Sequence, residues 1–196
     1  MTAITKRDRS FGEPLVTLGH RYTSKLVTAV ANDPSLGPAG AEVFESFFAK
    51  NYELVLRTLY LVTGDRGEAE DLAQESFVKA YERWDRIHKM DNPSGYVYRM
   101  ALNAYRSRLR RIGVAARRTV SPRESDAISE SDDRDAIRRA LAMLPDAQRE
   151  VIVLIEWLGM TSEEAGKVLG VSPGAVRVRL TRAKQALRSA TEGAPA

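Results

Sequence analysis

The residues best suited to contacting another molecule are a run of arginines and one lysine near the end of the chain. Between Ser172 and Arg188 there are five cations and no acid, so a helix there would have no ion pairs along its own length. Arginine pairs bidentately with guanine or phosphate, and the methyl groups of valine and threonine contact thymine. This combination of side chains is typical of a helix that enters the major groove of DNA.

Helical geometry separates these cations from an apolar stripe. At about 100° per residue, Val176, Leu180, Ala183 and Leu187 share one side of the helix, and Val178 lies almost opposite them. A solvated basic surface is the alternative interpretation, but such a surface does not need an apolar residue at position 178. The residues predicted to contact DNA are Ser172, Arg177, Val178, Arg179, Thr181, Arg182 and Lys184.

The elements before this helix predict a helix-turn-helix. Thr161 and Glu164 have the spacing of a capping box, which starts a short helix. Gly170 permits a sharp turn, Ser172 is a good N-cap, and Pro173 fits the first position of the second helix. Two short helices with a glycine turn and a capped second helix have the signature of this DNA-binding motif.

Composition excludes several other functions. The chain has 196 residues, a net charge of +4 and no cysteine, so disulfides and thiolate metal sites are excluded. His20 and His88 lie far apart without ligand spacing, and no carboxylate is paired for catalysis, so neither a metal, a cofactor nor an enzymatic activity is expected. Because no apolar run approaches the roughly 20 residues of a membrane span and no signal peptide is evident, the sequence predicts a cytoplasmic protein without membrane contact.

Apolar periodicity predicts an all-α fold with two small helical domains. We expect a three-helix bundle over residues 41–112 and the helix-turn-helix domain over 135–190, joined by a flexible acidic linker over 113–134. Residues 1–40 are expected to be a poorly ordered extension. The predicted buried stripes include Phe44, Phe48, Val55, Leu59 and Val62; Val97, Met100, Ala101 and Ala104; and Ile137, Leu141 and Leu144.

The first domain has a charge asymmetry of its own. Seven arginines and no acid lie between Arg99 and Arg118, whereas residues 65–85 hold seven acids against three cations. Arg99, Arg106 and Arg110 fall on one helix face. The basic face suits nucleic acid and the acidic helix suits a basic protein partner, although either face alone could simply be solvated.

Three segments together resemble a known family. "DLAQESFVKAYERWDR" (71–86), "NPSGYVYRMALNAYRSRLRR" (92–111) and "LPDAQREVIVLIEWLGMTSEEAGKVLGVSPGAVRVRLTRAKQALR" (144–188) resemble the bacterial extracytoplasmic-function (ECF) sigma factors of the sigma-70 family, which are specificity subunits of RNA polymerase. The resemblance covers roughly residues 41–190 and keeps the order and spacing of several motifs.

The resemblance implies roles for both domains. It implies that the second domain reads the minus-thirty-five element as duplex and that the linker runs through polymerase near its active site. The implied partners are the clamp and flap regions of core polymerase and promoter DNA, and the sequence leaves open whether an anti-sigma factor is a further partner. A minus-ten base would be held in a pocket within residues 87–98. The implied polymerase contacts are Asp71, Leu72, Gln74 and Glu75, and the implied minus-ten contacts are Asn92, Tyr96, Arg99, Asn103, Arg106 and Arg110.

One departure and two alternatives stand beside this interpretation. Tyr96 occupies a position where many members of the family have tryptophan, and a tyrosine ring can still stack on a base. A free-standing helix-turn-helix regulator would explain the second domain but leave the first without a role. A protein-interaction module that mimics a sigma factor would bind polymerase without transcription, and the basic helix disfavours it.

Overall fold

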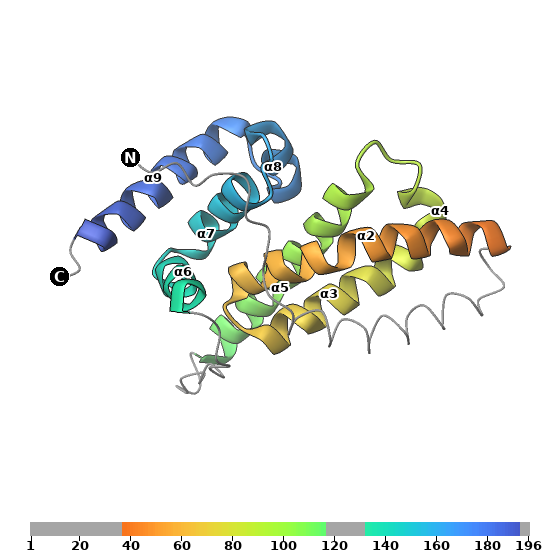
Figure 1. The fold of residues 1–196 in the computed structure, drawn as a ribbon, viewed down its shortest axis with the longest axis horizontal. Helices are drawn as coiled ribbons and strands as arrows, with labels where there is room; N and C mark the ends of the chain where they lie inside the picture. Colours follow the sequence, from red (N-terminus) through yellow and green to blue (C-terminus); the bar gives the residue numbers. More distant parts are fainter. Residues whose placement is uncertain (1–36, 117–131, 193–196) are drawn as a thin grey trace. The chain divides into compact units, whose positions relative to one another are not determined.

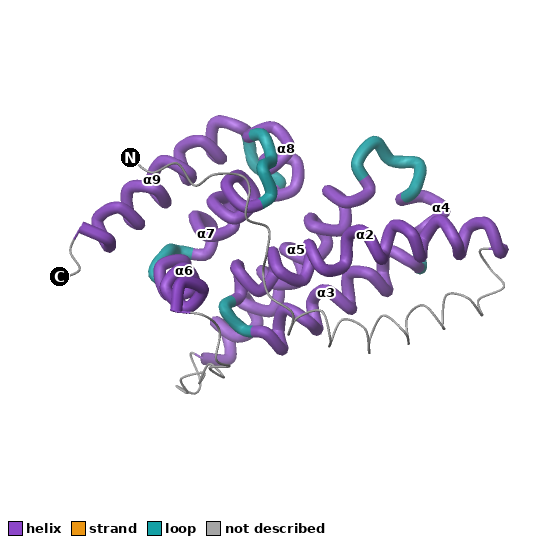
Figure 2. Tube along the Cα trace, in the orientation of Figure 1, coloured by secondary structure: helices purple, strands orange, loops and turns teal. Residues whose placement is uncertain are grey.

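The computed structural model describes residues 37–116 and 132–192 (Figure 1), and all regular secondary structure in these two ranges is helical (Figure 2). The expected all-α fold is therefore confirmed. By its contacts the chain divides into two units, Met1–Ala49 and Lys50–Ala196, with the boundary inside the first described helix. The domain limits 41–112 and 135–190 stay a prediction. None of the described helices is long and apolar enough to cross a membrane.

Helix α2 (Gly37–Thr63) carries the first predicted stripe. Phe44, Phe48, Val55, Leu59 and Val62 are all buried, as expected. The helix starts at residue 37, so the prediction that residues 37–40 belong to a poorly ordered extension is wrong, and residues 1–36 lie outside the described ranges. It ends at Gly64, whose positive φ of 72° is the left-handed conformation that glycine adopts without strain.

Helices α3 (Arg66–Tyr81) and α5 (Pro93–Ala116) pack against each other, with the short α4 (Trp84–Ile87) between them in sequence. A side chain caps the N-terminus of each long helix. For α3, Asp65 Oδ1 accepts a hydrogen bond from the amide of Glu68 at 2.8 Å. For α5, Asn92 Oδ1 accepts one from the amide of Gly95 at 2.7 Å. Helix α5 thus starts with Asn92 as its N-cap and Pro93 at its first position, where the missing N–H of proline costs no hydrogen bond.

The buried face of α5 differs from the predicted stripe. Met100 and Ala104 are only half-buried, whereas three further side chains fill the core. The buried apolar side chains of this helix, over the residues whose burial is described, are Val97, Tyr98, Ala101, Leu102 and Tyr105. The core side is therefore wider and more aromatic than the predicted one.

Two helices extend into the range predicted as a linker, because α5 continues to Ala116 and α6 (Asp132–Ala142) begins before residue 135. The expectation of a linker is therefore wrong for 113–116 and 132–134, and the rest of it, residues 117–131, lies outside the described part of the chain. Leu141 and Leu144 are buried as expected, but Ile137 is 50% exposed, so its assignment to the core is wrong.

The last four elements form the helix-turn-helix and its support. Helix α7 (Asp146–Ile152) continues into a π-helical turn, η1 (Val153–Trp157), which ends before Gly159 at φ +69°. Helices α8 (Ser162–Leu169) and α9 (Pro173–Glu192) follow, and α9 packs against both α7 and α8. The long basic helix is thus supported along one side by two other helices.

Candidate nucleic-acid and protein interfaces

The turn between α8 and α9 is fixed by capping and by close approach of the backbone. The predicted capping box is present, with the amide of Glu164 donating to Thr161 Oγ1 at 3.2 Å and the amide of Thr161 donating to Glu164 Oε2 at 2.8 Å. These bonds from Thr161, its backbone N–H first, lower the pKa of the Glu164 carboxyl. Gly170 ends α8 at φ +70°, and a Cβ on Gly166 would lie 2.8 Å from the carbonyl oxygen of Val171.

Helix α9 buries the predicted apolar stripe. Val176 and Ala183 are fully buried, and Leu180 and Leu187 are half-buried. Ser172 is its N-cap, since its Oγ accepts from the amide of Ala175 at 3.2 Å, so this side chain starts the helix. The stripe sets which residues of α9 can face DNA.

The outer face of α9 presents the predicted mixture of cations and methyl groups. Arg177, Thr181 and Arg182 are exposed, and Val178 is 51% exposed. Arg179 and Lys184 are half-buried and flank the stripe. Exposing the valine side chain to water is unfavourable, and contact with the methyl group of a thymine would remove it from water.

Acids from other elements reach two of these cations. Arg177 lies 3.7 Å from Glu163 of α8, and Lys184 lies 2.7 Å from Glu156 of η1. Both pairs are well exposed, so each holds its cation only weakly. The cations of α9 therefore remain available to a polyanion.

Helix α5 brings together most of the residues implied for minus-ten contact. Arg99, Asn103 and Arg110 are exposed and Tyr96 is half-buried, all on one helix face. Asn92 lies just before the helix, where its side-chain oxygen caps the first turn. The sixth residue, Arg106, is different, because its guanidinium is bound to Glu150 of α7.

The acidic face of α3 carries the residues implied for polymerase contact, except one. Asp71 is exposed and Gln74 and Glu75 are half-buried, but Leu72 is fully buried. The side chain of Leu72 therefore anchors α3 in the core and offers no contact surface.

The acids of α3 meet basic residues of α5. Arg108 donates to Glu75 at 3.0 Å and lies 3.9 Å from Asp71, while Lys79 donates to Glu75 at 2.6 Å. The hydrogen bond from Lys79, with a further one from Arg108, lowers the pKa of the Glu75 carboxyl. Beside these pairs runs an open groove of about 450 Å³, lined by Asp65, Glu68, Asp71, Arg108, Arg111 and Ile112.

Sequence reasoning missed the partners of the arginines. Arg106 and Glu150 are 44 positions apart, and Arg108 and Glu75 are 33 apart, so no local spacing indicates either pair. An acid inside the apolar run that follows residue 148 was the available signal for a buried ion pair. Within the described residues, no group of three or more His, Cys, Asp or Glu side chains is placed to hold a metal ion.

Comparison with known proteins assigns both halves of this arrangement. The family model "Sigma-70 region 2" matches residues 47–114, and "Sigma-70, region 4" matches residues 134–187. The ECF RNA polymerase sigma factor ShbA of Streptomyces griseus is 33% identical over 170 residues, covering 78% of this chain and 89% of that protein. This chain belongs to the sigma-70 family. Within it, the chain is an ECF sigma factor.

One further sequence relative and one solved structure are similar to this ECF sigma factor. The RNA polymerase sigma-E factor of Streptomyces avermitilis is 30% identical over 152 residues, covering 76% of this chain and 85% of that protein. The sigma factor RpoE of Bartonella quintana, solved in complex with the anti-sigma factor NepR, shares the fold at a TM-score of 0.71 and 24% identity, covering 79% of this chain and 99% of that one.

Proposed function

We propose that this ECF sigma factor binds core RNA polymerase and directs transcription initiation at promoters that carry a minus-ten and a minus-thirty-five element. The observation that carries the proposal is the outer face of α9, where exposed arginines flank an exposed valine and an exposed threonine. The N-terminal caps of α8 and α9 and the glycine turn between the two helices fix the position of this face. A matching region 2 in the same chain distinguishes this function from that of a free-standing regulator.

In region 4, α9 reads the upstream element as duplex in the major groove. Arg177, Val178 and Arg182 face outward, and arginine and valine recognise guanine and thymine edges respectively. Ser172 caps α9, so its hydroxyl and the first amides of the helix lie where a phosphate would bind. Arg179, Thr181 and Lys184 complete the surface.

In region 2, α5 contacts the downstream element and α3 contacts the polymerase clamp. Tyr96 is half-exposed near the start of α5, where its ring can stack on an unpaired base. Arg99, Asn103 and Arg110 continue along the same face toward the phosphates. Asp71, Gln74 and Glu75 give α3 an acidic surface for a basic helix of the polymerase.

The proposal extends to where the protein acts and to its control. As a transcription factor it acts in the cytoplasm and supplies binding energy rather than catalytic groups. The structural neighbour in complex with NepR supports an anti-sigma factor as a partner.

Run-off transcription with purified core polymerase and a library of promoter fragments tests the proposal. Specific transcripts that need both the polymerase and this protein are expected, and their enriched sequences define both elements. Tight binding to duplex DNA by the protein alone, with no protein-dependent transcript, would instead establish a free-standing DNA-binding regulator.

A further inference from the structure

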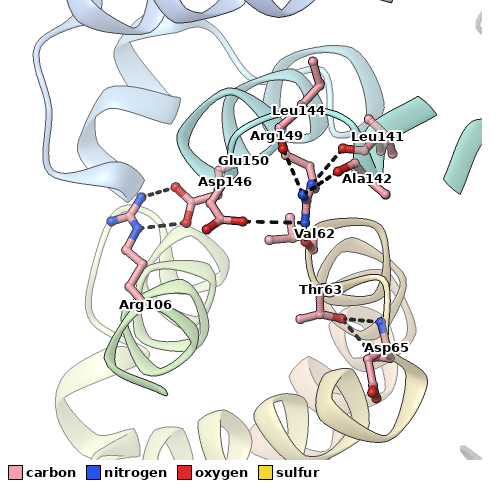
Figure 3. Close-up of polar contacts among 10 residues, drawn as sticks. All are labelled: Val62, Thr63, Asp65, Arg106, Leu141, Ala142, Leu144, Asp146, Arg149 and Glu150. Atoms are coloured by element: carbon pink, nitrogen blue, oxygen red, sulfur yellow. Dashed lines mark hydrogen bonds and ion pairs between the residues drawn. The ribbon is translucent and has the colours of Figure 1, made fainter. Parts of the chain in front are cut away.

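Arg106 lies on the DNA-facing side of α5 and yet is bound by an acid of region 4. Its Nε donates to Glu150 Oε1 at 2.8 Å, and Nη2 donates to Oε2 of the same carboxylate (Figure 3). Its Nη1 also donates to the carbonyl oxygen of Leu169 at 3.2 Å. The guanidinium therefore satisfies one carboxylate and the last turn of α8 together, and both attract a cation.

The environment of Glu150 makes this pair more than a surface contact. Glu150 is only 1% exposed, and a buried carboxylate without its cation is strongly unfavourable. Glu150 thus depends on Arg106 as long as α5 and α8 stay packed, and they do pack in this structure. If the two helices separate, water can hydrate both charges.

A second arginine joins the same two regions. Arg149, next to Glu150, donates to the carbonyl oxygen of Val62 at the end of α2 at 2.9 Å. It also donates to the carbonyl oxygen of Leu141 in the last turn of α6 at 2.8 Å and to that of Leu144, just after α6, at 2.9 Å. Figure 3 shows Arg106 and Arg149 on opposite sides of Glu150 and Asp146. Tyr105 is buried nearby, and burial first, then the charge of Asp146, raises its pKa to about 12. Glu150 and Tyr105 are therefore buried at this junction, whereas the side chain of Arg106 stays 24% exposed.

Such packing is incompatible with simultaneous binding to both promoter elements. Elements centred about 25 base pairs apart are roughly 85 Å apart along straight duplex at 3.4 Å per pair. Helix α9 has 20 residues and is about 30 Å long. With α5 held against α8, α5 and α9 cannot span that separation, so the junction must open on the promoter.

We propose that Arg106 is a latch: Glu150 holds it in the free chain, and a promoter phosphate takes the place of Glu150 when regions 2 and 4 separate. The inference rests on the proposed function, because it requires α5 to contact DNA. A carboxylate and a phosphate accept the same bidentate pair from a guanidinium, so Glu150 and DNA compete for one group. By linkage, DNA that binds only the opened chain must favour opening.

The distance between the two regions tests the latch directly. Because the chain has no cysteine, the exposed Glu82→Cys and Ser189→Cys changes can carry a fluorophore pair on the full chain. With Glu150 and Arg106 unchanged, the labelled protein is expected to show mainly one short distance between the two fluorophores. In Glu150→Gln, most molecules are expected to show a longer distance between them. The matched control, Glu53→Gln, removes the ion pair with Arg57 within α2 and should leave the distance unchanged. An unchanged distance in Glu150→Gln would overturn the latch.

A charge exchange keeps the test decisive if Glu150→Gln fails to fold, which circular dichroism would reveal. Arg106→Glu combined with Glu150→Arg restores an ion pair at the same place. The short distance should return in this double variant and be lost in Arg106→Glu alone. A long distance in the folded double variant would contradict the proposal.

Binding to random-sequence duplex DNA tests the second half of the proposal. Glu150→Gln should bind several-fold more tightly than the unchanged chain, with the slope of log K against log salt steeper by about 0.9 for one added phosphate contact. Adding Arg106→Gln should abolish the gain. If Glu150→Gln opens the chain without changing this slope, Arg106 does not exchange between Glu150 and DNA. The distance measurement needs no polymerase, so its result is separate from a failure of run-off transcription.

Discussion

Helices α5 and α9 are both rich in arginine, but they hold their cations in different ways. On α9, Arg177 and Lys184 meet acids only in exposed pairs. On α5, Arg106 is bound to a buried carboxylate and Arg108 to Glu75 of α3. Each helix thus has two arginine or lysine side chains paired with acids, but only α5 pairs one of them, Arg106, with a buried carboxylate.

The difference follows from what packs against each helix. Helix α9 packs against α7 and α8 through one apolar stripe, and its cations lie on the remaining sides of the helix. Helix α5 packs against both α3 and α8, so basic residues on two of its sides reach acids of neighbouring elements. Under the proposed latch, promoter contact by Arg106 requires rearrangement, whereas Arg99 and Arg110 of α5 and the outer face of α9 are already exposed.

The largest expected effect is on stability, when a leucine on the inner face of either helix is shortened to alanine. Leu102 of α5 is fully buried, and Leu102→Ala should lower the free energy of unfolding by about 3 kcal/mol through lost contacts and a cavity. Leu180 of α9 is half-buried, so Leu180→Ala should cost about 1 kcal/mol. Chemical denaturation of both variants measures this, and equal losses would contradict the difference in packing.

Removing an outward arginine from α9 should weaken DNA recognition without affecting the fold. Arg182→Ala should lose about 1–3 kcal/mol of binding at one position of the upstream element if the guanidinium meets a base. Arg177→Ala should behave alike at another position. Binding of the polymerase complex to matched and altered promoters measures the loss; an equal loss on scrambled DNA would show contact with phosphate alone.

Charge reversal on α3 should weaken binding to polymerase. Glu75→Lys removes an acid from the proposed docking face and leaves Arg108 without its nearest carboxylate, so affinity for core polymerase should fall by roughly tenfold, or about 1.4 kcal/mol. Glu42→Lys changes the charge equally at an exposed position of α2 and serves as the control. Equal affinities for the two variants would show that α3 is not the docking face.

The smallest expected effect is at the start of α8. Thr161→Ala removes the hydroxyl that caps the helix and should cost about 1 kcal/mol of stability. The same hydroxyl donates to Glu164 Oε2 at 2.9 Å and helps to lower the pKa of that carboxyl, so this bond stabilises the fold above the unfolded value of 4.5 and is lost as pH falls through the lowered pKa. Thermal melts at neutral and acidic pH should therefore show a smaller difference between variant and unchanged chain at acidic pH.

Local chemistry explains which features could be predicted from the sequence. Capping at Thr161, Ser172 and Asn92 and the glycine turns at Gly64, Gly159 and Gly170 depend on adjacent residues, and the structure has all of them. Apolar spacing likewise predicted the buried face of α2. Ile137 followed the same spacing, but no neighbour covers it enough to bury it.

Contacts between distant segments could not be predicted in this way. The pairing of Arg106 with Glu150 and of Arg149 with the carbonyl of Val62 depends on α5, α7 and the end of α2 meeting in space. The sequence assigned Arg106 to a DNA face because its neighbours at helical spacing are basic. The acid at position 150 indicated a buried ion pair, but nothing in the sequence identified Arg106 as its partner.

The most direct test of the account is whether α9 and α5 read different promoter elements. Transcription would be measured with core polymerase and unchanged protein, Arg182→Ala or Arg99→Ala, on promoters altered in the upstream or the downstream element alone. Arg182→Ala is expected to lose sensitivity to upstream changes only, and Arg99→Ala to lose sensitivity to downstream changes only. If both variants lost sensitivity to the same element, the assignment of one helix to each element would be contradicted.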